Sequence, residues 1–339
     1  MTGLALLGAG RIGKLHARAA REAGGRLLAI YDVAGAAAEA LAGETGAVQA
    51  ATAEAAVAHE GVEGAIIASS TDAHVDHILL AVAAGRRVLC EKPLAPTLGE
   101  AERCLDVLGE PSSQVQIGFN RRFDPSHAAL AAALAAGEIG RLEQLVITSR
   151  DPAPPPYDYI PRSGGLYRDM TIHDFDTARW LLGEEPETVF AHGASLFDPE
   201  IRRLGDIDTA AVTLITGSGR ECVILNSRRA AHGYDQRIEA FGEKGMLISD
   251  NHPRTGLKRS GGEGYGAADR LFEFFLDRYV DSYRLEIAAF IATIRDGGQA
   301  PVTAEDGYRA LVLAEAAAAS HEAGRPARID GRRIEVAGQ

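Results

Sequence analysis

The chain has 339 residues, of which 46% are hydrophobic, and it carries a formal net charge of −12 at pH 7. This length predicts two domains with sizeable cores. The acidic balance, without any long basic tract, excludes nucleic acid and anionic membranes as expected partners. Cys90, Cys104 and Cys222 lack metal-site spacing, which favours a reduced, cytoplasmic protein. We expect no signal peptide, because the first residues lack a basic region, and no membrane span, because the small-apolar run 128–136 is too short.

The first predicted elements are a strand, a tight turn and a helix around a glycine motif. The apolar run Leu4–Leu7 leads into Gly8-Ala9-Gly10-Arg11-Ile12-Gly13, and a helical pattern follows. Gly8 permits the turn, Gly10 lets the backbone approach a pyrophosphate, and Gly13 allows the helix to pack closely on the strand. The helix N-terminus supplies N–H donors and a positive dipole, so this setting predicts a dinucleotide-binding site.

Asp32 ends the next apolar run, Leu27–Tyr31, about 20 residues after the last glycine. A carboxylate at this place would bind both ribose hydroxyls of adenosine and would repel a 2′-phosphate. Val33 and Ala34 follow it, and no arginine does. The sequence therefore predicts NAD rather than NADP as the cofactor.

Strand-like and helical stretches alternate through the first third of the chain. This rhythm is typical of a doubly wound parallel sheet, so we expect a Rossmann domain over residues 1–120. The strands are predicted at Leu4–Leu7, Leu27–Tyr31, Gly64–Ala68, Arg87–Cys90 and Gln114–Gly118. The helices are predicted at Lys14–Ala23, Val33–Leu41, Ala73–Ala84 and Thr97–Leu108.

The tripeptide Glu91-Lys92-Pro93 follows one of these strands. Its place is the carboxyl edge of the parallel sheet, where such folds bind their ligands. There the ammonium of Lys92 would bind the reacting oxygen and stabilise the negative charge that develops on it. Taken alone, a lysine in this tripeptide would be a solvated surface residue.

After residue 120 the pattern becomes rich in strands separated by turns. We expect an α+β domain over residues 121–339, with a mostly antiparallel open sheet, for substrate binding and oligomerisation. Its strands are predicted at Leu142–Ser149, Thr188–Ser195, Thr209–Ile215, Glu221–Ser227, Gln236–Gly242 and Gly245–Ile248. Its helices are predicted at Ser126–Ala136, Tyr279–Arg295 and Thr303–Ala323, and the last two could pack back on either domain.

Two segments give no assignable pattern. Asp151–Arg162 is rich in proline and is predicted to be a stiff loop. The stretch 251–270 is rich in glycine and arginine and is a candidate for a mobile loop.

Asp169 and His173 lie four residues apart. If a helix begins near Asp169, both side chains project from one face and can address one small ligand. The pKa of imidazole lies near neutrality, so His173 suits the removal of a hydroxyl proton during alcohol oxidation. Alternatively, Asp169 is only an N-cap, or these two residues and Asp176 hold a divalent metal in an isomerase or hydrolase. No further metal-ligand motif supports the metal alternative.

Together these motifs resemble the Gfo/Idh/MocA oxidoreductase family over nearly the whole chain. The family-level matches are the glycine motif, Glu91-Lys92-Pro93 and the Asp169/His173 pair. Further stretches resemble the bacterial inositol 2-dehydrogenases within that family, namely residues 118–124, 149–152, 169–176 and 233–236. Asn120 and the segments 151–162 and 251–270 depart from the pattern and leave the substrate open.

The resemblance implies an NAD-dependent dehydrogenase that oxidises a secondary hydroxyl of a cyclic polyol, myo-inositol or scyllo-inositol, to an inosose. It implies that Lys92, Asp169 and His173 are catalytic, with His173 as the general base. The implied cofactor-binding residues are Gly8, Gly10, Arg11, Ile12, Asp32, Ser70, Thr71 and Glu91. The implied substrate-binding residues are Asn120, Arg121, Asp151 and Tyr234. It implies no metal, and it implies a homo-oligomer, either a tetramer or a dimer.

Two other functions stay open. A sugar dehydrogenase acting on an aldopyranose would share all three catalytic residues. A nonenzymatic NAD-binding sensor is disfavoured, because Lys92, Asp169 and His173 are all present.

Overall fold

A computed structural model describes residues 1–262 and 264–338. The described chain divides into two compact units. The first consists of Met1–Asp124 and Asp281–Leu311, and the second of Pro125–Val280 and the chain from Val312 onward. Each unit is therefore built from segments far apart in the sequence. The assignment of substrate binding and oligomerisation to the second domain stays a prediction.

The first unit contains a six-stranded sheet in the order β3-β2-β1-β4-β5-β6, in which every pair of neighbours is parallel. This confirms the predicted doubly wound sheet. The strands are β1 (Thr2–Leu7), β2 (Gly25–Tyr31), β3 (Val48–Gln49), β4 (Gly64–Ile67), β5 (Arg87–Glu91) and β6 (Val115–Gly118). All six residues of β1 are buried, as expected for a central strand that is covered on both faces.

The helices of this unit follow the predicted positions closely. They are α1 (Arg11–Glu22), α2 (Gly35–Thr45), α3 (Ala53–Ala58), α4 (His74–Ala83) and α5 (Leu98–Leu108), with the short turns η1 (Thr71–Ala73), η2 (Glu110–Gln114) and η3 (Asn120–Phe123). The elements β3 and α3 were not predicted, because a two-residue strand and a six-residue helix are too short to show a period.

Helix α11 (Val280–Asp296) contributes its apolar face to the first unit. Ile287, Phe290 and Ile291 are all buried. A Cβ built at Gly64 would lie 3.0 Å from the Phe290 ring, and one built at Gly25 would lie 3.1 Å from the Ile291 methyl. The helix therefore packs close to the backbone of the parallel sheet although it comes from much later in the sequence.

The second unit contains an eight-stranded sheet in the order β12-β11-β7-β10-β9-β8-β15-β16. The β7 and β10 strands are parallel and the other neighbours are antiparallel, which confirms the predicted mostly antiparallel sheet. The strands are β7 (Leu142–Arg150), β8 (Pro186–Ala194), β9 (Thr209–Thr216), β10 (Glu221–Ser227), β11 (Asp235–Gly242), β12 (Gly245–Ser249), β15 (Ala327–Asp330) and β16 (Arg333–Val336). The last two were not predicted.

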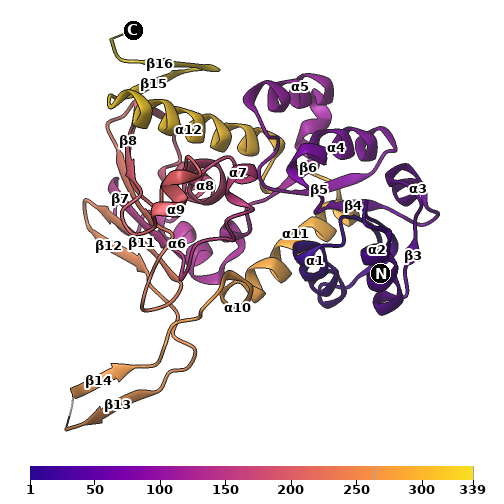
Figure 1. Cartoon of the computed structure of the whole chain (residues 1–339), viewed down its shortest axis with the longest axis horizontal. Coiled ribbons are helices and arrows are strands. Elements are labelled where there is room, and N and C mark those ends of the chain that lie inside the picture. The colour runs from indigo at the N-terminus through magenta and orange to yellow at the C-terminus, as the bar shows by residue number, and fades with distance from the viewer. Residues whose placement is uncertain (263, 339) are drawn as a thin grey trace. The chain divides into compact units, whose positions relative to one another are not determined.

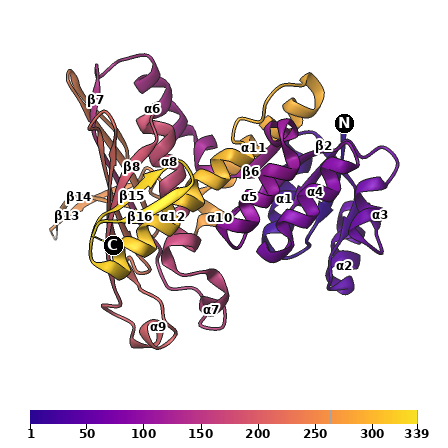
Figure 2. The ribbon, with the colours of Figure 1, turned by 90° about the horizontal axis from the view of Figure 1, so that it is seen from above.

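Helices cover one face of this sheet (Figure 2). They are α6 (Pro125–Ala135), α8 (Ile172–Leu182) and α12 (Ala304–Ala323), while α7 (Ile160–Ser163), α9 (Pro199–Arg203) and α10 (Phe275–Arg278) are short. Alternate strand residues such as Ile147, Leu214 and Ile224 form the buried core beneath the long helices. The other face keeps large apolar side chains 41–54% exposed, namely Phe190, Ile215, Phe241, Met246 and Ile248.

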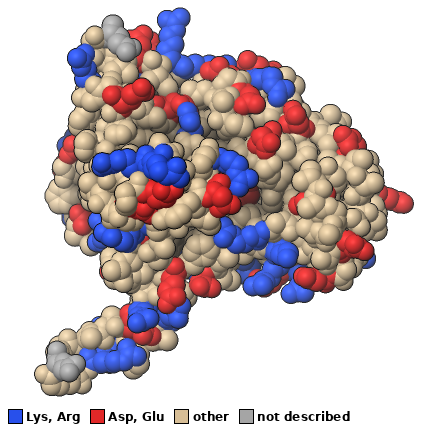
Figure 3. Space-filling view, viewed as in Figure 1, with Lys and Arg blue, Asp and Glu red and all other residues tan. Residues whose placement is uncertain are grey.

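The stretch without an assignable pattern near residue 260 forms a two-stranded hairpin, β13 (Lys258–Gly261) and β14 (Gly264–Ala268), which extends away from the main sheet of its unit (Figure 1). Its strands are almost wholly exposed. Glycine is frequent in both strands and they lack apolar alternation, which explains why no strand was predicted. Basic side chains are visible on it in the space-filling view (Figure 3).

Candidate active site

The glycine loop between β1 and α1 has the geometry that a dinucleotide needs. Gly8 has φ +106°, and a Cβ there would lie 2.3 Å from the carbonyl oxygen of Ala68. A Cβ at Gly13 would lie 2.0 Å from the carbonyl oxygen of Gly8. A Cβ at Gly10 would meet nothing within 4 Å, and no side chain caps α1. Gly8 and Gly13 are therefore required by the fold itself, whereas the bare backbone at Gly10 leaves room for a ligand.

Asp32 lies directly after β2, beside this loop. Its Oδ2 accepts a hydrogen bond from the Ala9 N–H at 2.6 Å, and its Oδ1 accepts one from the Ala34 N–H at 2.7 Å. These bonds fix the carboxylate next to the glycine turn. No arginine adjoins it in the sequence, since Val33 and Ala34 follow.

The remaining predicted cofactor residues lie on neighbouring loops of the same sheet edge. Arg11 and Ile12 open α1, and Ser70 and Thr71 follow β4. The ring of His74 lies between two such loops, with Nε2 3.2 Å from the Ser69 carbonyl oxygen and Nδ1 2.8 Å from that of Pro93. Burial lowers the pKa of His74, so the neutral ring donates to one of these carbonyls.

Glu91 and Lys92 stand at the carboxyl end of β5. Glu91 Oε1 lies 2.7 Å from His16 Nε2, and Glu91 Oε2 accepts a hydrogen bond from the Lys92 backbone N–H at 3.3 Å. Burial opposes ionisation of Glu91, but its hydrogen bond to His16 and the charges of His16 and Lys92 outweigh burial and lower its pKa. The peptide bond from Lys92 to Pro93 is cis.

Asn120 and Arg121 lie on η3, immediately after β6, and both are buried. The Asn120 side-chain amide donates to the Ser282 hydroxyl at 3.2 Å, which ties η3 to α11. The role of these two residues as substrate ligands stays a prediction.

In the second unit, Asp169 is not on a regular α-helix, so the condition for the predicted Asp169/His173 face is not met. Asp169 lies in the π-helical turn η4 (Tyr167–Thr171), and α8 begins only at Ile172. Two side chains from elsewhere hold this wide turn. Asp206 accepts from the Leu166 N–H at 2.9 Å, and Asn226 accepts from the Thr171 hydroxyl at 2.7 Å. Such tertiary bonds override the helical spacing, and π-turns occur frequently at functional sites.

The carboxylate of Asp169 is held by two donors that the sequence did not reveal. The Tyr159 hydroxyl donates to Oδ1 at 3.0 Å, and Arg228 Nη1 donates to Oδ2 at 3.4 Å. Arg228 Nη2 also donates to Asp206 at 3.1 Å, and the Arg228 side chain is 1% exposed. Tyr159 comes from the proline-rich loop and Arg228 from the end of β10, where no motif marks either residue.

His173 lies on the first turn of α8 and is half-buried. Asp174 and Asp176 are both fully buried, and Asp174 accepts from the Asn226 amide at 2.7 Å. Asp174 is therefore bound within the core of its unit, as a structural carboxylate is. Across residues 1–262 and 264–338, no group of three His, Cys, Asp or Glu side chains could hold a metal ion.

Asp151 and Tyr234 lie at the same end of β7 and β11. Asp151 follows β7, and its N–H donates to the Ser227 carbonyl at 2.9 Å. Tyr234 precedes β11, is buried, and packs edge-on against Tyr279 with ring centroids 5.9 Å apart. Asp235 pairs with Arg150 at the end of the β7–β11 ladder, so Tyr234 and Asp151 are the residues that directly flank this last pair.

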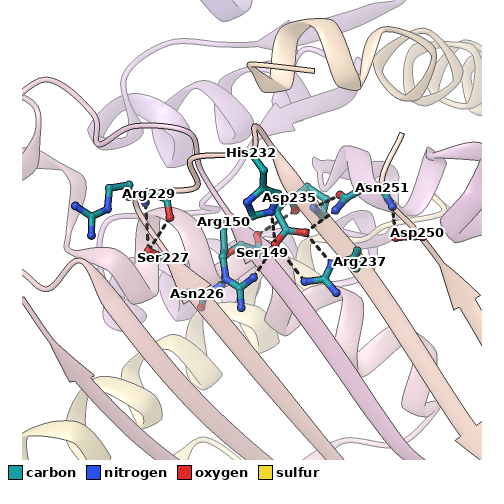
Figure 4. Close-up of polar contacts among 11 residues, drawn as sticks. Ser149, Arg150, Asn226, Ser227, Arg229, His232, Asp235, Arg237, Asp250 and Asn251 are labelled. Carbon is teal, nitrogen blue, oxygen red and sulfur yellow. Dashed lines mark hydrogen bonds and ion pairs between the residues drawn. The ribbon is translucent and has the colours of Figure 1, made fainter. Parts of the chain in front are cut away.

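Asp235 ties this end of the sheet together (Figure 4). Its carboxylate accepts from Arg150 at 2.7 Å, from Arg237 Nε at 2.8 Å and from the Asn251 amide at 2.6 Å. Burial opposes its ionisation, yet these donors lower the pKa of Asp235 to about 2. The carboxylate therefore stays charged and keeps the ends of β7 and β11 in register.

Comparison with known proteins shows the family of both parts of the chain. Residues 2–119 match the model of an oxidoreductase family with an NAD-binding Rossmann fold, and residues 127–248 match the C-terminal domain of the Gfo/Idh/MocA family. The chain belongs to the Gfo/Idh/MocA family of oxidoreductases.

Several similar proteins are named as inositol dehydrogenases. An inositol 2-dehydrogenase from Rhizobium meliloti is 46% identical over 316 residues, which cover 93% of this chain and 95% of the relative. The crystal structure of a myo-inositol dehydrogenase from Corynebacterium glutamicum has a TM-score of 0.93 at 44% identity, covering 97% of this chain and 99% of that one. That of a scyllo-inositol dehydrogenase from Lactobacillus casei, with bound NAD(H) and scyllo-inositol, has a TM-score of 0.88 at 28% identity, with coverages of 97% and 99%.

No helix within the described residues is long and apolar enough to span a bilayer.

Proposed function

We propose that this protein is an NAD-dependent dehydrogenase that oxidises one secondary hydroxyl of a cyclic polyol of the inositol type to an inosose. The observation that carries the proposal is the presence of Lys92 after β5, Asp169 in η4 and His173 in α8 in a chain 46% identical to an inositol 2-dehydrogenase. Myo-inositol and scyllo-inositol are the first candidate substrates, because relatives are named for each.

The first unit fits NAD. The uncapped N-terminus of α1 and the open space at Gly10 suit a pyrophosphate. Asp32, held by the N–H groups of Ala9 and Ala34, suits the adenosine ribose and disfavours a 2′-phosphate by charge repulsion. Arg11, Ile12, Ser70, Thr71 and Glu91 are proposed to complete this site. When bound, NAD supplies the acceptor for a hydride.

The chain's own residues would manage the proton and the oxygen. His173 takes the hydroxyl proton as general base, since the pKa of an imidazole ordinarily lies near neutrality. Lys92 donates to the reacting oxygen and stabilises its developing negative charge. Asp169, aligned by Tyr159 and Arg228, accepts from a polyol hydroxyl and orients the ring.

The proposed polyol contacts are Asn120, Arg121, Asp151 and Tyr234. A neutral ligand with many hydroxyls needs several separate hydrogen-bonding groups rather than a cluster of counter-charges. Charged, amide and phenolic groups at these positions meet that need. Loss of one such partner would leave buried polar groups unpaired, at about 1–3 kcal/mol each.

We also propose that the enzyme is a cytoplasmic homo-oligomer, a tetramer or a dimer. The free thiols of Cys90, Cys104 and Cys222 support a reducing compartment. The exposed apolar face of the large sheet, which includes Phe241 and Ile248, supports self-association. Light scattering of the full chain tests the assembly, and a monomer at assay concentrations would contradict it.

The decisive experiment is an NADH-formation assay with myo-inositol, scyllo-inositol, other inositol isomers, glucose and other aldopyranoses, with NAD and NADP compared. We expect activity with an inositol and NAD. His173→Ala should lower turnover by roughly 10²–10⁴-fold, the usual contribution of a general base, with NAD affinity retained. His59→Ala, a histidine without a proposed site role, is the control.

Each alternative outcome of this assay has a clear meaning. Activity with a pyranose but no inositol would replace this proposal with a sugar dehydrogenase. NAD binding without oxidation of any polyol or sugar would indicate a nonenzymatic sensor. Equal use of NADP would refute the role proposed for Asp32.

A further inference from the structure

A buried histidine joins two loops at the carboxyl edge of the parallel sheet. His74, the first residue of α4, is 1% exposed. Its Nδ1 lies 2.8 Å from the carbonyl oxygen of Pro93, and its Nε2 lies 3.2 Å from that of Ser69. Pro93 belongs to the segment that carries Lys92, and Ser69 follows β4, next to Ser70 of the proposed cofactor site. One side chain therefore contacts the main chain of both loops.

The loop after β4 is itself packed on the glycine turn. A Cβ built at Gly8 would lie 2.3 Å from the carbonyl oxygen of Ala68 and 2.6 Å from the backbone nitrogen of Ser69. The Ser69 hydroxyl lies 3.0 Å from Nδ1 of His77, which is one turn further along α4. Ser69 is thus held by its backbone against the glycine turn and by its side chain against the helix that carries His74.

The Lys92 segment lies beyond the ladder of the sheet. Strand β5 pairs with β6 as far as Glu91 and Gly118. On one side of Lys92, its own N–H donates to the Glu91 carboxylate at 3.3 Å. On the other side, the carbonyl of Pro93 faces the His74 ring. These two contacts hold the Lys92 backbone from both sides, and His74 supplies the contact that comes from a different element.

One proton decides which of the two loops His74 binds. An imidazolium would donate to both carbonyls, whereas a neutral ring donates to only one. Burial lowers the pKa of His74 and favours the neutral ring, although both carbonyls and the charge of Glu91 oppose this shift. The shorter distance, 2.8 Å, marks the Pro93 carbonyl as the acceptor. Nδ1 therefore carries the proton and donates toward the Lys92 segment.

We propose that His74 is a positioning residue for Lys92, which it places by donating from Nδ1 to the Pro93 carbonyl. The inference rests on the proposed function, in which Lys92 stabilises the negative charge that develops on the reacting oxygen. A displacement of about 1 Å at such a site can cost roughly a hundredfold in rate. His74 thus affects turnover through the place of the Lys92 backbone.

Two substitutions separate the roles of the two ring nitrogens. The amide nitrogen of asparagine can take the place of Nδ1, and that of glutamine the place of Nε2. His74→Asn keeps the donor to Pro93, so kcat with NAD and a polyol should stay close to wild type. His74→Gln loses that donor, so kcat should fall roughly tenfold to a hundredfold. His74→Phe, which keeps a ring but has no donor, should behave like His74→Gln.

Competitive acetylation of the full chain gives a readout that needs no activity. Mass spectrometry reports the labelling rate of Lys92 relative to Lys14, Lys244 and Lys258. This relative rate should change in His74→Gln, because the Lys92 ammonium has moved into different surroundings. It should stay as in wild type in His74→Asn. A histidine that merely fills space would give no such difference between the two amide variants.

The matched control is His59→Gln, because Nδ1 of His59 also lies 2.9 Å from a backbone carbonyl, that of Glu60, at the end of α3. It should change neither kcat nor the labelling of Lys92. Equal kcat in His74→Asn and His74→Gln, or a lower kcat in His74→Asn, would overturn the positioning role. If the labelling follows the prediction but the wild type oxidises no polyol or sugar, the proposed function fails while the placement of Lys92 by His74 stands.

Discussion

Arg228 binds two carboxylates, Asp169 and Asp206, while its own side chain is almost completely removed from water. Desolvation makes such a group costly unless every charge has a partner. The same arrangement fixes the direction of the Asp169 carboxylate, because a guanidinium donates in a rigid plane. The stability of the fold and the orientation of the Asp169 carboxylate thus both depend on the side chain of one residue, Arg228.

Arg228→Met should destabilise the fold by about 3–5 kcal/mol, because it strands the buried carboxylate of Asp206. Adding Asp206→Asn should recover much of that loss, since the stranded charge is gone. Turnover should stay low in the double variant, because Asp169 has lost its donor. Urea unfolding and polyol oxidation kinetics measure the two effects.

The exposed ion pair of Arg203 with Glu200 gives the control for this experiment. Arg203→Met should change the free energy of unfolding by less than about 1 kcal/mol. Wild-type turnover in the Arg228→Met, Asp206→Asn double variant would contradict the orienting role of Arg228.

Strands β7 and β11 depend on a charge at their shared end. Asp235 is fully buried and receives hydrogen bonds from Arg150, Arg237 and Asn251, from three different segments. The neighbouring residues Asp151 and Tyr234 are proposed to contact the polyol. At the scale of elements, this clamp determines how accurately two strand ends present those side chains.

Asp235 makes the second unit sensitive to acid. Its folded pKa of about 2 lies below the ordinary value of 3.8. The ionised carboxylate therefore stabilises the fold fully above about pH 5, and this stabilisation is lost as the pH falls toward 2. Because the arginine partners are partly exposed, the loss in the free energy of unfolding is at most about 2 kcal/mol. Asp235→Asn should weaken stability at pH 7 and flatten this acid dependence. Urea unfolding between pH 2 and 7 checks it, and an unchanged slope in the variant would refute the assignment.

Each unit is discontinuous in sequence, so each needs two segments that lie far apart in the chain in order to fold. Helix α11 buries Ile287, Phe290 and Ile291 in the first unit, although the second unit's main segment lies between them and β6. A fragment that ends after β6 would expose the apolar surface that this helix covers. We therefore expect that the segment up to β6 does not fold by itself into an NAD-binding domain.

We expect a fragment of residues 1–124 to unfold without a cooperative transition and to bind NAD poorly. A matched variant, in which residues 281–311 are fused to this fragment through a flexible linker, should recover cooperative unfolding. Urea titration and NAD binding by calorimetry compare the two. Cooperative unfolding and full NAD affinity in the shorter fragment would contradict the structural role of α11.

Features that depend on residues close together in the chain were predictable from the sequence. Gly13 was recognisable from a motif because a Cβ there would meet the carbonyl oxygen of Gly8 in the same turn, and Gly8 because the turn itself needs a positive φ. The strands were recognisable from apolar runs of the right length. Glu91-Lys92-Pro93, Asp169 and His173 were recognisable because their residue types and spacing are short-range properties. These features sufficed for the family, the parallel sheet and the candidate chemistry.

Features that depend on contacts between distant residues appear only in the folded chain. The π-turn at Asp169 follows from bonds to Asp206 and Asn226, residues that no local spacing connects to it. Arg228, a partner of Asp169, likewise comes from an element distant in sequence, namely the end of β10. A lone arginine has no periodic signal, and only burial reveals that its charge must be paired.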